Sequence, residues 1–474
     1  MTSMTTAHSV HIASLGCARN DVDSEELAAR LEVGGFVLVD DPEAAETVVV
    51  NTCGFVEQAK QDSINTLLEA AELKGGGTVR SVVAVGCMAE RYGVQLADEL
   101  PEADAVLGFD DYADIADRLR GILDGEHHIS HVPRDRRTLL PLTPSARRAG
   151  SAGVAVPGHA ALPEGLAPAS GPRTLRRRLT GGPSASLKIA SGCDRRCSFC
   201  AIPAFRGSYL SRPVEELEAE ARWLVEQGVK EVFLVSENTS SYGKDLGADH
   251  RLETLLARLS RVDGLDWIRV SYLQPAEIRP GMLEAMLTTD KVVPYFDLSF
   301  QHASRSVLRA MRRFGDPDSF LDLIGRIRSQ APAAGIRSNV IAGFPGETDA
   351  DVDILKQFIV DANLDVMGVF GYSDEEGTEG VSLPGHLPEE EIEARRALLA
   401  DLALEVCEAR AADRVGEDIV VLVESIDDEV VGRAMHQGPE TDGVVTLDRD
   451  AAVGDLVAAH VTDSAGIDLI AEAK

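Results

Sequence analysis

The chain has 474 residues, of which 44% are hydrophobic and 26% are charged, a composition typical of a globular protein with several domains. Its formal net charge of −32 disfavours a nucleic-acid partner unless basic groups are concentrated locally. No apolar run approaches the roughly 20 residues that span a bilayer, and the start MTSMTTAHSVHIASLG lacks the pattern of a secretory signal. We therefore expect no membrane partner and a cytoplasmic protein, in which clustered cysteines indicate metal binding or catalysis before disulfides.

Residues 1–130 alternate short apolar runs with helical patterns. VHIASLG leads to Cys17, TVVVNT to Cys53 and SVVAVG to Cys87, and DAVLG is a fourth expected strand. Repeated strand–helix units predict a doubly wound parallel sheet with helices on its faces. Ligands bind beyond the carboxyl ends of such strands, so the three cysteines are predicted to converge there.

Residues 131–185 are rich in Pro, Gly, Ala and Arg and have no apolar period. This composition predicts a flexible linker or insertion. The simplest expectation for its arginines is a solvated, locally basic segment. The alternative is an arm that touches an acidic partner such as ribosomal RNA, so any nucleic-acid contact is expected to be weak or to run through this segment.

Residues 186–410 resume the alternation of strands and helices. Six strands are expected at SLKIA, VKEVFLVS, WIRVSY, YFDLSFQ, IRSNVIAGF and DVMGVFGY. Six βα units are too few for a closed eight-stranded barrel, so we predict an open partial (βα)6 TIM-like barrel with its active site at the strands' C-terminal ends. In residues 411–474, short strands joined by turns predict a small antiparallel β-barrel.

Cys193, Cys197 and Cys200 form a C-x3-C-x2-C group directly after the expected strand SLKIA. Iron–sulfur clusters are usually held by four cysteine thiolates, so three close thiolates would leave one iron open to a substrate or cofactor. Zinc is the alternative, although it prefers a fourth protein ligand nearby and the sequence shows no obvious one.

Cys17, Cys53 and Cys87 are the candidates for a second cluster with an open iron, because each follows a parallel strand in the same way. Taken singly, each could instead be a small buried hydrophobic residue. Cys407 lies in a helical pattern and is expected to be part of the core or a spare thiol.

SGCDRRCSFCAIPAFRG resembles the radical S-adenosylmethionine (SAM) signature, and the whole chain resembles the methylthiotransferase family of radical SAM enzymes. SLGCARNDVDSE, NTCGFVEQAKQDSI and AVGCMAERY resemble its N-terminal domain, QHASRSVLRAMRR and NVIAGFPGET its core, and the tail a TRAM domain. The resemblance implies SAM and two [4Fe-4S] clusters, one on the catalytic Cys193, Cys197 and Cys200 and one on Cys17, Cys53 and Cys87.

In the scheme that this resemblance implies, the first cluster cleaves SAM to a 5′-deoxyadenosyl radical and the second holds the sulfur. A sulfur donor and a flavodoxin- or ferredoxin-like electron donor are then expected as partners. Ser236, Glu237 and Asn238 end an expected strand and are candidates to bind the amino or ribose groups of SAM. Arg337 is the candidate for its carboxylate, and Gly343, with Gly346, for a close backbone approach. Each of these could also be ordinary loop or core structure.

Two branches of the family compete: RimO-type enzymes act on an aspartate β-carbon of the twelfth small-subunit ribosomal protein, and MiaB-type enzymes on a transfer RNA adenosine. GYSDEEGTEG is acidic where the transfer RNA branch has an Arg-Pro stretch, and acids in both regions include Asp374, Glu375, Glu376, Asp427, Asp428, Glu429, Glu440 and Asp442. A TRAM domain that grips RNA should be basic, whereas an acidic one suits a basic ribosomal protein, free or on the ribosome. We therefore favour the RimO-type activity over the transfer RNA activity and over a non-catalytic iron–sulfur or zinc module.

Overall fold

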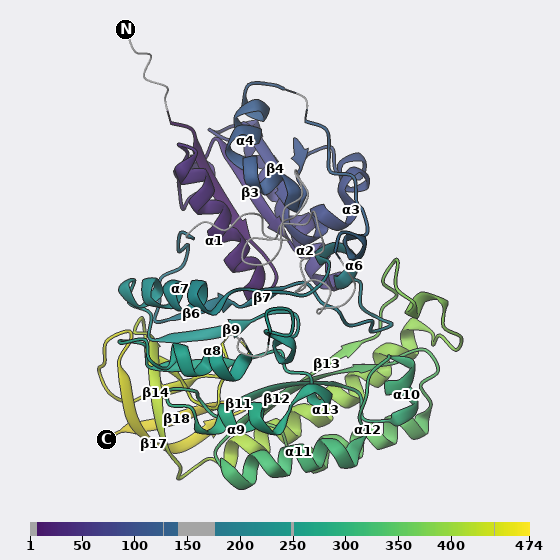
Figure 1. The fold of residues 1–474 in the computed structure, drawn as a ribbon, viewed down its shortest axis with the longest axis vertical. Helices are drawn as coiled ribbons and strands as arrows, with labels where there is room; N and C mark the ends of the chain where they lie inside the picture. The colour runs from purple at the N-terminus through teal and green to yellow at the C-terminus, as the bar shows by residue number, and fades with distance from the viewer. Residues whose placement is uncertain (1–6, 127, 141–175, 248–250, 440) are drawn as a thin grey trace. The chain divides into compact units, whose positions relative to one another are not determined.

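The computed structural model describes residues 7–126, 128–140, 176–247, 251–439 and 441–474 (Figure 1). The chain divides into two compact units. The first comprises Met1–Gly181, Ala190–Asp194 and Ala201–Ser211, and the second comprises Gly182–Ile189, Arg195–Cys200 and Arg212–Lys474. Across the described ranges, no helix combines the length and apolar character needed to cross a membrane.

A parallel sheet is the centre of the first unit, and its strands lie in the order β2 (Val37–Leu38), β1 (Ser9–Ser14), β3 (Thr47–Thr52), β4 (Ser81–Val85) and β5 (Ala105–Val106). Helices alternate with these strands: α1 (Ala18–Val33), α2 (Glu57–Glu72), α3 (Gly86–Glu99) and α4 (Ile115–Leu123). Every residue of β3 and β4 is buried, as expected for strands covered on both faces. The short edge strand β2 was not among the expected strands.

The two faces of this sheet pack on different helices. Val49 and Val83 lie in a core cluster with Leu27 of α1 and with residues of α4. Val48 lies in a separate cluster with Leu67 of α2 and with residues of α3. Because neighbouring residues of a strand point to opposite faces, this division confirms the predicted doubly wound sheet.

The segment predicted as a flexible insertion is described only at its two ends, and residues 141–175 lie outside the described residues. At these ends Arg134, Arg137 and Arg177 are exposed, as expected, but the prediction of solvated arginines is wrong for Arg136 and Arg176. Arg136 is buried and donates to Glu90 at 2.6 Å and to Asp110 at 2.7 Å. Arg176 is also buried and lies 3.3 Å from Glu25. These two arginines therefore pair with acids elsewhere in the first unit. The composition of the segment alone could not reveal such distant partners.

Two three-stranded parallel sheets form the core of the second unit. The first has the order β6 (Ser184–Lys188), β9 (Glu231–Val235) and β10 (Trp267–Val270). The second has the order β11 (Tyr295–Gln301), β12 (Gly335–Ala342) and β13 (Val366–Gly371). An isolated parallel bridge between Leu273 and Leu298 connects the two sheets. All six expected strands are present, and no ladder joins β6 to β13 in the described residues, which confirms the open partial barrel.

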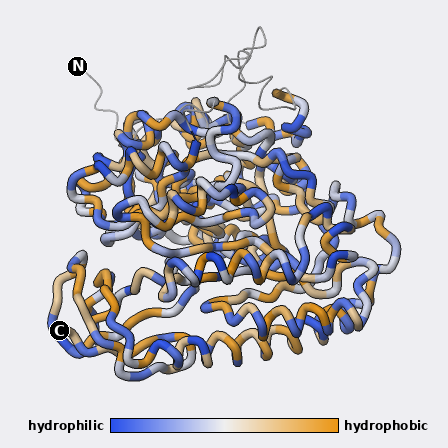
Figure 2. Tube along the Cα trace, turned by 60° about the horizontal axis from the view of Figure 1, so that its bottom comes forward, coloured by the Kyte–Doolittle hydropathy of each residue, from blue (hydrophilic) through white to orange (hydrophobic). Residues whose placement is uncertain are grey.

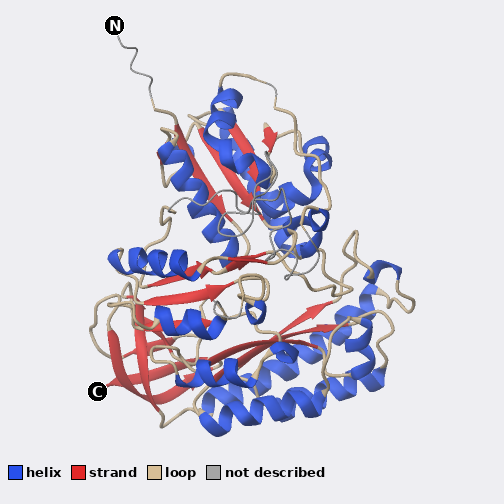
Figure 3. Ribbon diagram, in the orientation of Figure 1, coloured by secondary structure: helices blue, strands red, loops and turns tan. Residues whose placement is uncertain are grey.

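Helices follow these strands along the chain: α7 (Val214–Glu226), α8 (Leu252–Leu259), α9 (Pro280–Thr288), α10 (Arg305–Ala310), α11 (Pro317–Gln330), α12 (Asp349–Ala362) and α13 (Glu389–Ala412) (Figure 3). Helical turns that are visible in Figure 2 alternate between hydrophobic and hydrophilic residues, the pattern of helices that bury one face. Cys407 is buried in α13, as expected.

The C-terminal strands close into a barrel in the order β14 (Asp418–Ser425), β15 (Val430–Ala434), β16 (Val445–Leu447), β18 (Asp468–Ala473) and β17 (Leu456–Ala465). The predicted small barrel is confirmed, but the pair of β16 and β18 is parallel, whereas the other ladders are antiparallel. The physical reason is that five strands cannot alternate in direction all the way round a closed ring.

Within the second unit, the C-terminal barrel contacts the beginnings of the core strands. Glu231, the first residue of β9, pairs with Arg269 of β10 at 2.6 Å and with Arg433 of β15 at 2.5 Å, and all three side chains are buried. Asp442 accepts hydrogen bonds from Tyr295 at 2.6 Å and from Arg337 at 2.8 Å. Asp442 is thus a buried partner and not one of the predicted surface acids. Because the barrel contacts the beginnings of the core strands, it does not occupy their C-terminal ends, where the active site is expected.

Candidate active site

Three cysteines of the first unit lie at one edge of its sheet. Cys17 follows β1, Cys53 follows β3 directly, and Cys87 lies in the first turn of α3 after β4, and these strands are neighbours. Gly16 adjoins Cys53 so closely that a Cβ at Gly16 would lie 3.0 Å from the Cys53 Sγ. A Cβ at Gly54 would lie 3.0 Å from the backbone of Cys87. The glycines therefore allow the three cysteine-bearing turns to approach one another.

Two arginines direct N–H groups at these sulfurs. Arg206 donates to the Cys87 Sγ at 3.0 Å, and Arg19 donates to the Cys17 Sγ at 3.5 Å. Burial raises the pKa of Cys87 to about 12 although Arg206 opposes it. Burial also acts on Cys17, but Arg19 and Arg206 outweigh it, so the pKa of that thiol is lowered. The site thus already contains cations that favour the thiolate form, which is the form that binds metal.

The loop of Cys193, Cys197 and Cys200 follows β6, and all three thiols are half-buried. The Cys193 amide donates to the Gly207 carbonyl at 3.0 Å, and the Cys200 amide donates to the Cys197 carbonyl at 3.2 Å. Arg313 reaches the Cys197 Sγ at 3.7 Å.

Ser198 anchors the middle of this loop. Its side chain is buried, its hydroxyl donates to the Ala310 carbonyl at 2.7 Å and its amide donates to the Met311 carbonyl at 3.2 Å. The backbone between the cysteines is therefore fixed before any cofactor binds.

Glu277 connects the cysteine loop with the loop after β9 inside the second unit. Its carboxylate pairs with Arg195 and with Lys244, and accepts from Ser241 at 2.8 Å and from Asn238 at 3.4 Å. Burial raises the pKa of Glu277, but Lys244 and Arg195 outweigh it and lower that pKa overall. The sequence reasoning missed Glu277, although its place after the strand WIRVSY was an available signal.

Ser236, Glu237 and Asn238 do follow the C-terminal end of β9, as predicted. The Ser236 hydroxyl is buried and lies 3.0 Å from the Thr239 hydroxyl, so it takes part in its own turn. Asn238 is 2% exposed, and within the described residues its Oδ1 has no hydrogen-bond partner. An unsatisfied buried oxygen at a strand end is what a site for a ligand's N–H donor should contain.

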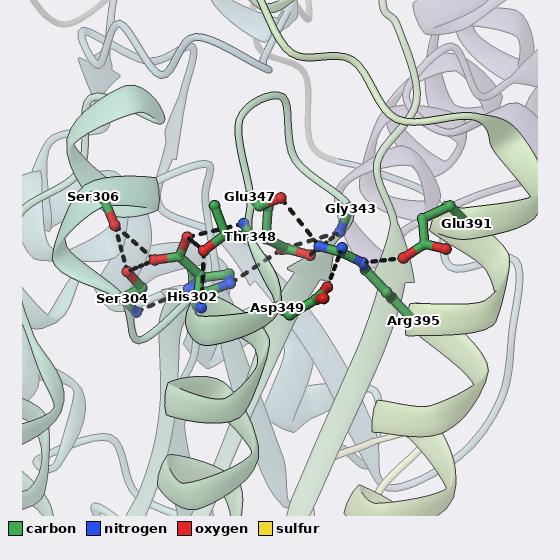
Figure 4. Close-up of polar contacts among 10 residues, drawn as sticks. His302, Ser304, Ser306, Gly343, Glu347, Thr348, Asp349, Glu391 and Arg395 are labelled. Carbon is green, nitrogen blue, oxygen red and sulfur yellow. Dashed lines mark hydrogen bonds and ion pairs between the residues drawn. The ribbon is translucent and has the colours of Figure 1, made fainter.

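A buried polar network lies after β11 and β12 (Figure 4). Glu347 accepts from His302 Nε2 at 3.2 Å, from the Gly343 amide at 3.0 Å and from Arg395 at 3.0 Å. His302 Nδ1 accepts from the Ser304 amide at 2.9 Å, so the ring proton is on Nε2 and donates to Glu347. Burial would raise the pKa of Glu347, but His302 and Arg395 lower it.

Gly343 is placed where the sequence predicted, directly after β12, with φ +76°. A Cβ there would lie 2.8 Å from Ile392, and the Gly343 amide is bonded to Glu347. Glycine is therefore required by the turn and by the packing of α13. Sequence reasoning missed the roles of Glu347 and Arg395. Glu347 lies in the motif NVIAGFPGET, whereas Arg395 lies outside it, in α13.

Arg337 is not brought together with the other candidates. It is the third residue of β12, whereas Gly343 follows the last, and its guanidinium is paired with Asp442 of the C-terminal barrel. Asp297 lies 3.9 Å from its Nε. The expectation that Arg337 pairs with the carboxylate of SAM is therefore corrected: this arginine attaches the barrel to the core.

The residues present fit iron–sulfur clusters by the chemistry of their donors. Each cysteine group offers three sulfurs, and an arginine N–H points at a sulfur in each. In the described ranges, no three His, Cys, Asp or Glu side chains are grouped to hold a metal ion. A cubane binds each thiolate through a different iron, so it tolerates a wider spacing than a single ion such as zinc.

Known families match three parts of the chain. The radical SAM superfamily matches residues 187–359, the TRAM domain residues 415–473, and the uncharacterized protein family UPF0004 residues 9–108. A solved structure of the radical S-adenosylmethionine methyltransferase TsrM from Kitasatospora setae superposes with a TM-score of 0.53 at 15% identity, covering 77% of this chain and 73% of that chain. At this identity the likeness shows a shared fold.

Curated relatives match nearly the whole chain. A protein of Cutibacterium acnes named "Ribosomal protein uS12 methylthiotransferase RimO" is 66% identical over 467 residues, which cover 98% of this chain and 97% of the relative. Proteins with the same name from Kineococcus radiotolerans and Streptomyces coelicolor are 62% and 60% identical, over 98% and 99% of this chain and 97% of each relative.

Proposed function

The chain belongs to the ribosomal protein uS12 methylthiotransferases, a family of radical SAM enzymes, and we propose on that premise that it adds a methylthio group to the β-carbon of an aspartate in uS12. The observation that carries the proposal is the high identity over nearly the full length to relatives that all bear this name. These names do not favour the transfer RNA alternative.

Cys193, Cys197 and Cys200 would hold one [4Fe-4S] cluster, and Cys17, Cys53 and Cys87 would hold the other. When bound, these clusters and SAM supply the radical that removes a hydrogen from the substrate carbon and the sulfur and methyl group that replace it. The chain itself contributes position and shielding.

Several residues of the second unit would position SAM. The Asn238 side-chain NH2 donates a hydrogen bond to Glu277, which orients the amide. The Asn238 Oδ1 then remains as an acceptor for an N–H of SAM. Ser236 and Glu237 complete the turn after β9. Glu347 holds the Gly343 turn, so the end of β12 keeps its shape when a ligand enters.

The segment after β13 supports a protein substrate. Asp374 is half exposed there, and it accepts from the Tyr372 hydroxyl at 2.9 Å. Asp427, Asp428 and Glu429 are exposed on the C-terminal barrel, whereas Glu440 lies outside the described residues. Exposed carboxylates near strand ends and on the barrel suit a basic ribosomal protein better than a phosphate backbone.

The remaining partners follow from the reaction. An electron donor of flavodoxin or ferredoxin type and a sulfur donor are needed, and the substrate is uS12, free or on the ribosome. We place the enzyme in the cytoplasm, where ribosomal proteins are found. Nucleic-acid contact, if the basic insertion provides it, would be an accessory to substrate binding.

Mass spectrometry of uS12 tests the proposal. The anaerobically reconstituted enzyme is incubated with uS12 or ribosomes, SAM, sulfide and a reductant, and in parallel with transfer RNA. The expected result is one uS12 peptide that gains the mass of CH2S at an aspartate, with unmodified transfer RNA. Methylthiolated adenosine and unchanged uS12 would refute it.

Cysteine variants separate the two sites. Cys193→Ala should abolish reductive cleavage of SAM, because its cluster would lose a ligand. Cys53→Ala should still cleave SAM but should not insert sulfur. Cys407→Ala is the matched control, because Cys407 belongs to neither cysteine group and is buried in α13, and it should retain both activities. Sulfur insertion by Cys53→Ala would contradict the second cluster.

A further inference from the structure

Arg206 is a buried arginine whose position the proposed reaction does not yet explain. It is the last residue of α6 (Ile202–Arg206), six positions after Cys200, and it belongs to the first unit. Its side chain is 3% exposed. A buried guanidinium is costly unless several partners satisfy it, so its contacts should indicate its role.

One nitrogen of this arginine serves both a sulfur and a carboxylate. Nη2 lies 3.0 Å from the Cys87 Sγ, 3.0 Å from the Asp23 Oδ2 and 3.4 Å from the Asn20 Oδ1. The guanidinium carbon also lies 5.2 Å from the centre of the Phe109 ring. The cation is therefore shared between Asp23, which is fully buried, and a proposed cluster ligand.

The backbone around Arg206 is tied to the other cysteine group. The carbonyl of the next residue, Gly207, accepts the Cys193 amide at 3.0 Å. A Cβ at Gly192 would lie 2.3 Å from the Ser208 carbonyl oxygen, so the two segments are in close contact. The strands β7 (Ala190–Ser191) and β8 (Leu210–Ser211), which flank these two segments, form an antiparallel pair. The segment that carries Cys193 thus places the arginine that contacts Cys87.

Charge explains what this contact can do. Three thiolates on a [4Fe-4S] core give a net negative site, and reduction adds one more negative charge. Net charge and hydrogen bonds to the sulfurs are among the factors that set the reduction potential of such clusters. A guanidinium N–H on a ligand sulfur favours the reduced form, and a carboxylate that shares the guanidinium weakens this effect.

We propose that Arg206 is a positioning residue of the N-terminal cluster. It holds the cluster through Cys87 and stabilises the reduced form of the cluster. The carboxylate of Asp23 limits this stabilisation. This inference rests on the proposed function only in taking Cys17, Cys53 and Cys87 as cluster ligands. A merely structural role of Arg206, as the partner of Asp23, predicts no ordered change of potential.

The test uses the full chain with Cys193, Cys197 and Cys200 replaced by alanine, so that iron at the N-terminal site alone is observed. Iron content and an EPR-monitored redox titration are measured for this background and for Asp23→Asn, Arg206→Gln and the double variant. The double variant removes both charges of the pair together, so it avoids leaving an unpaired buried charge.

All cluster-binding variants should contain about four irons per chain. Asp23→Asn should raise the midpoint potential. The midpoint potential of the double variant should be lower than that of Asp23→Asn by at least about 59 mV, which is a tenfold change in the one-electron reduction equilibrium. Arg206→Gln should lower the midpoint potential. If Arg206→Gln instead loses its iron while Asp23→Asn keeps its iron and has a raised potential, that result would also support the positioning role.

Unchanged potentials in Asp23→Asn and in the double variant would overturn the inference. A background chain that binds no iron would overturn the cluster assignment itself. That result is read from iron content, so it is distinguishable from a failure of the tuning role.

Discussion

Replacing Glu231 with glutamine tests how the C-terminal barrel is attached to the core strands. Burial raises the pKa of Glu231, but Arg269 and Arg433 outweigh it and lower that pKa from 4.5 to about 2. A shift of this size corresponds to about 3 kcal/mol of stability at neutral pH. Removing one partner of a buried ion pair costs a similar amount, about 3 to 5 kcal/mol, because the remaining charges stay buried. We therefore expect Glu231→Gln to lower the free energy of unfolding of the second unit by about 3 kcal/mol.

The sign of the pH dependence follows from the lowered pKa. The stabilisation by ionised Glu231 is complete above the ordinary value of 4.5 and is lost as the pH falls towards 2. The difference between wild type and Glu231→Gln should therefore be full at pH 7 and should shrink below pH 4.5.

Urea unfolding followed by tryptophan fluorescence measures this, because both tryptophans, Trp223 and Trp267, lie in the second unit. Trp267 is next to the network, with its ring 5.8 Å from the guanidinium of Arg269. Glu393→Gln is the matched control, since Glu393 is exposed and pairs with Arg396 on the surface. The reasoning is refuted if Glu231→Gln changes the midpoint no more than this control does.

Three further substitutions test other parts of the structure. Asp442→Asn should lower the free energy of unfolding in the same fluorescence assay by about 2 kcal/mol, because the bond from Tyr295 would lose a charged acceptor; an unchanged midpoint would contradict this. Gly86→Ala should reduce bound iron from about eight to about four per chain, because φ is +92° and a Cβ would lie 2.2 Å from the Asn51 side chain; full iron content would disprove the requirement. Glu347→Gln should weaken equilibrium binding of SAM at least tenfold while the cluster absorption is kept, because the Gly343 turn would be held less firmly; unaltered affinity would exclude this positioning role.

Much of the fold follows from local patterns. Strands such as TVVVNT carry an apolar run because they are buried on both faces, and the core strands of both units were expected from such runs. The prediction that Cys17, Cys53 and Cys87 converge rests on the same rule, since parallel neighbouring strands end at one edge. The odd strand count of the C-terminal barrel also required one parallel pair, which the prediction of an antiparallel barrel overlooked.

The other misses in the prediction concern charged residues. Arg136 was expected to be solvated and Asp442 to be a surface acid, yet both are buried with partners. Arg136 pairs with a residue 46 positions away, and Asp442 accepts from Arg337, which is 105 positions away. Arg206 contacts a sulfur 119 positions away. Partners this distant leave no mark on the local sequence pattern.

The sequence by itself determined the kinds of units, the strands that end in cysteines and the donor chemistry of both cysteine groups, because these depend on local periodicity and spacing. Only the tertiary structure decided which charged side chains are buried, which of them connect the barrel to the core, and which arginines reach the cysteine sulfurs. The physical reason is that a buried charge is tolerated only when distant segments supply its partners, so its role is set by the folded chain as a whole.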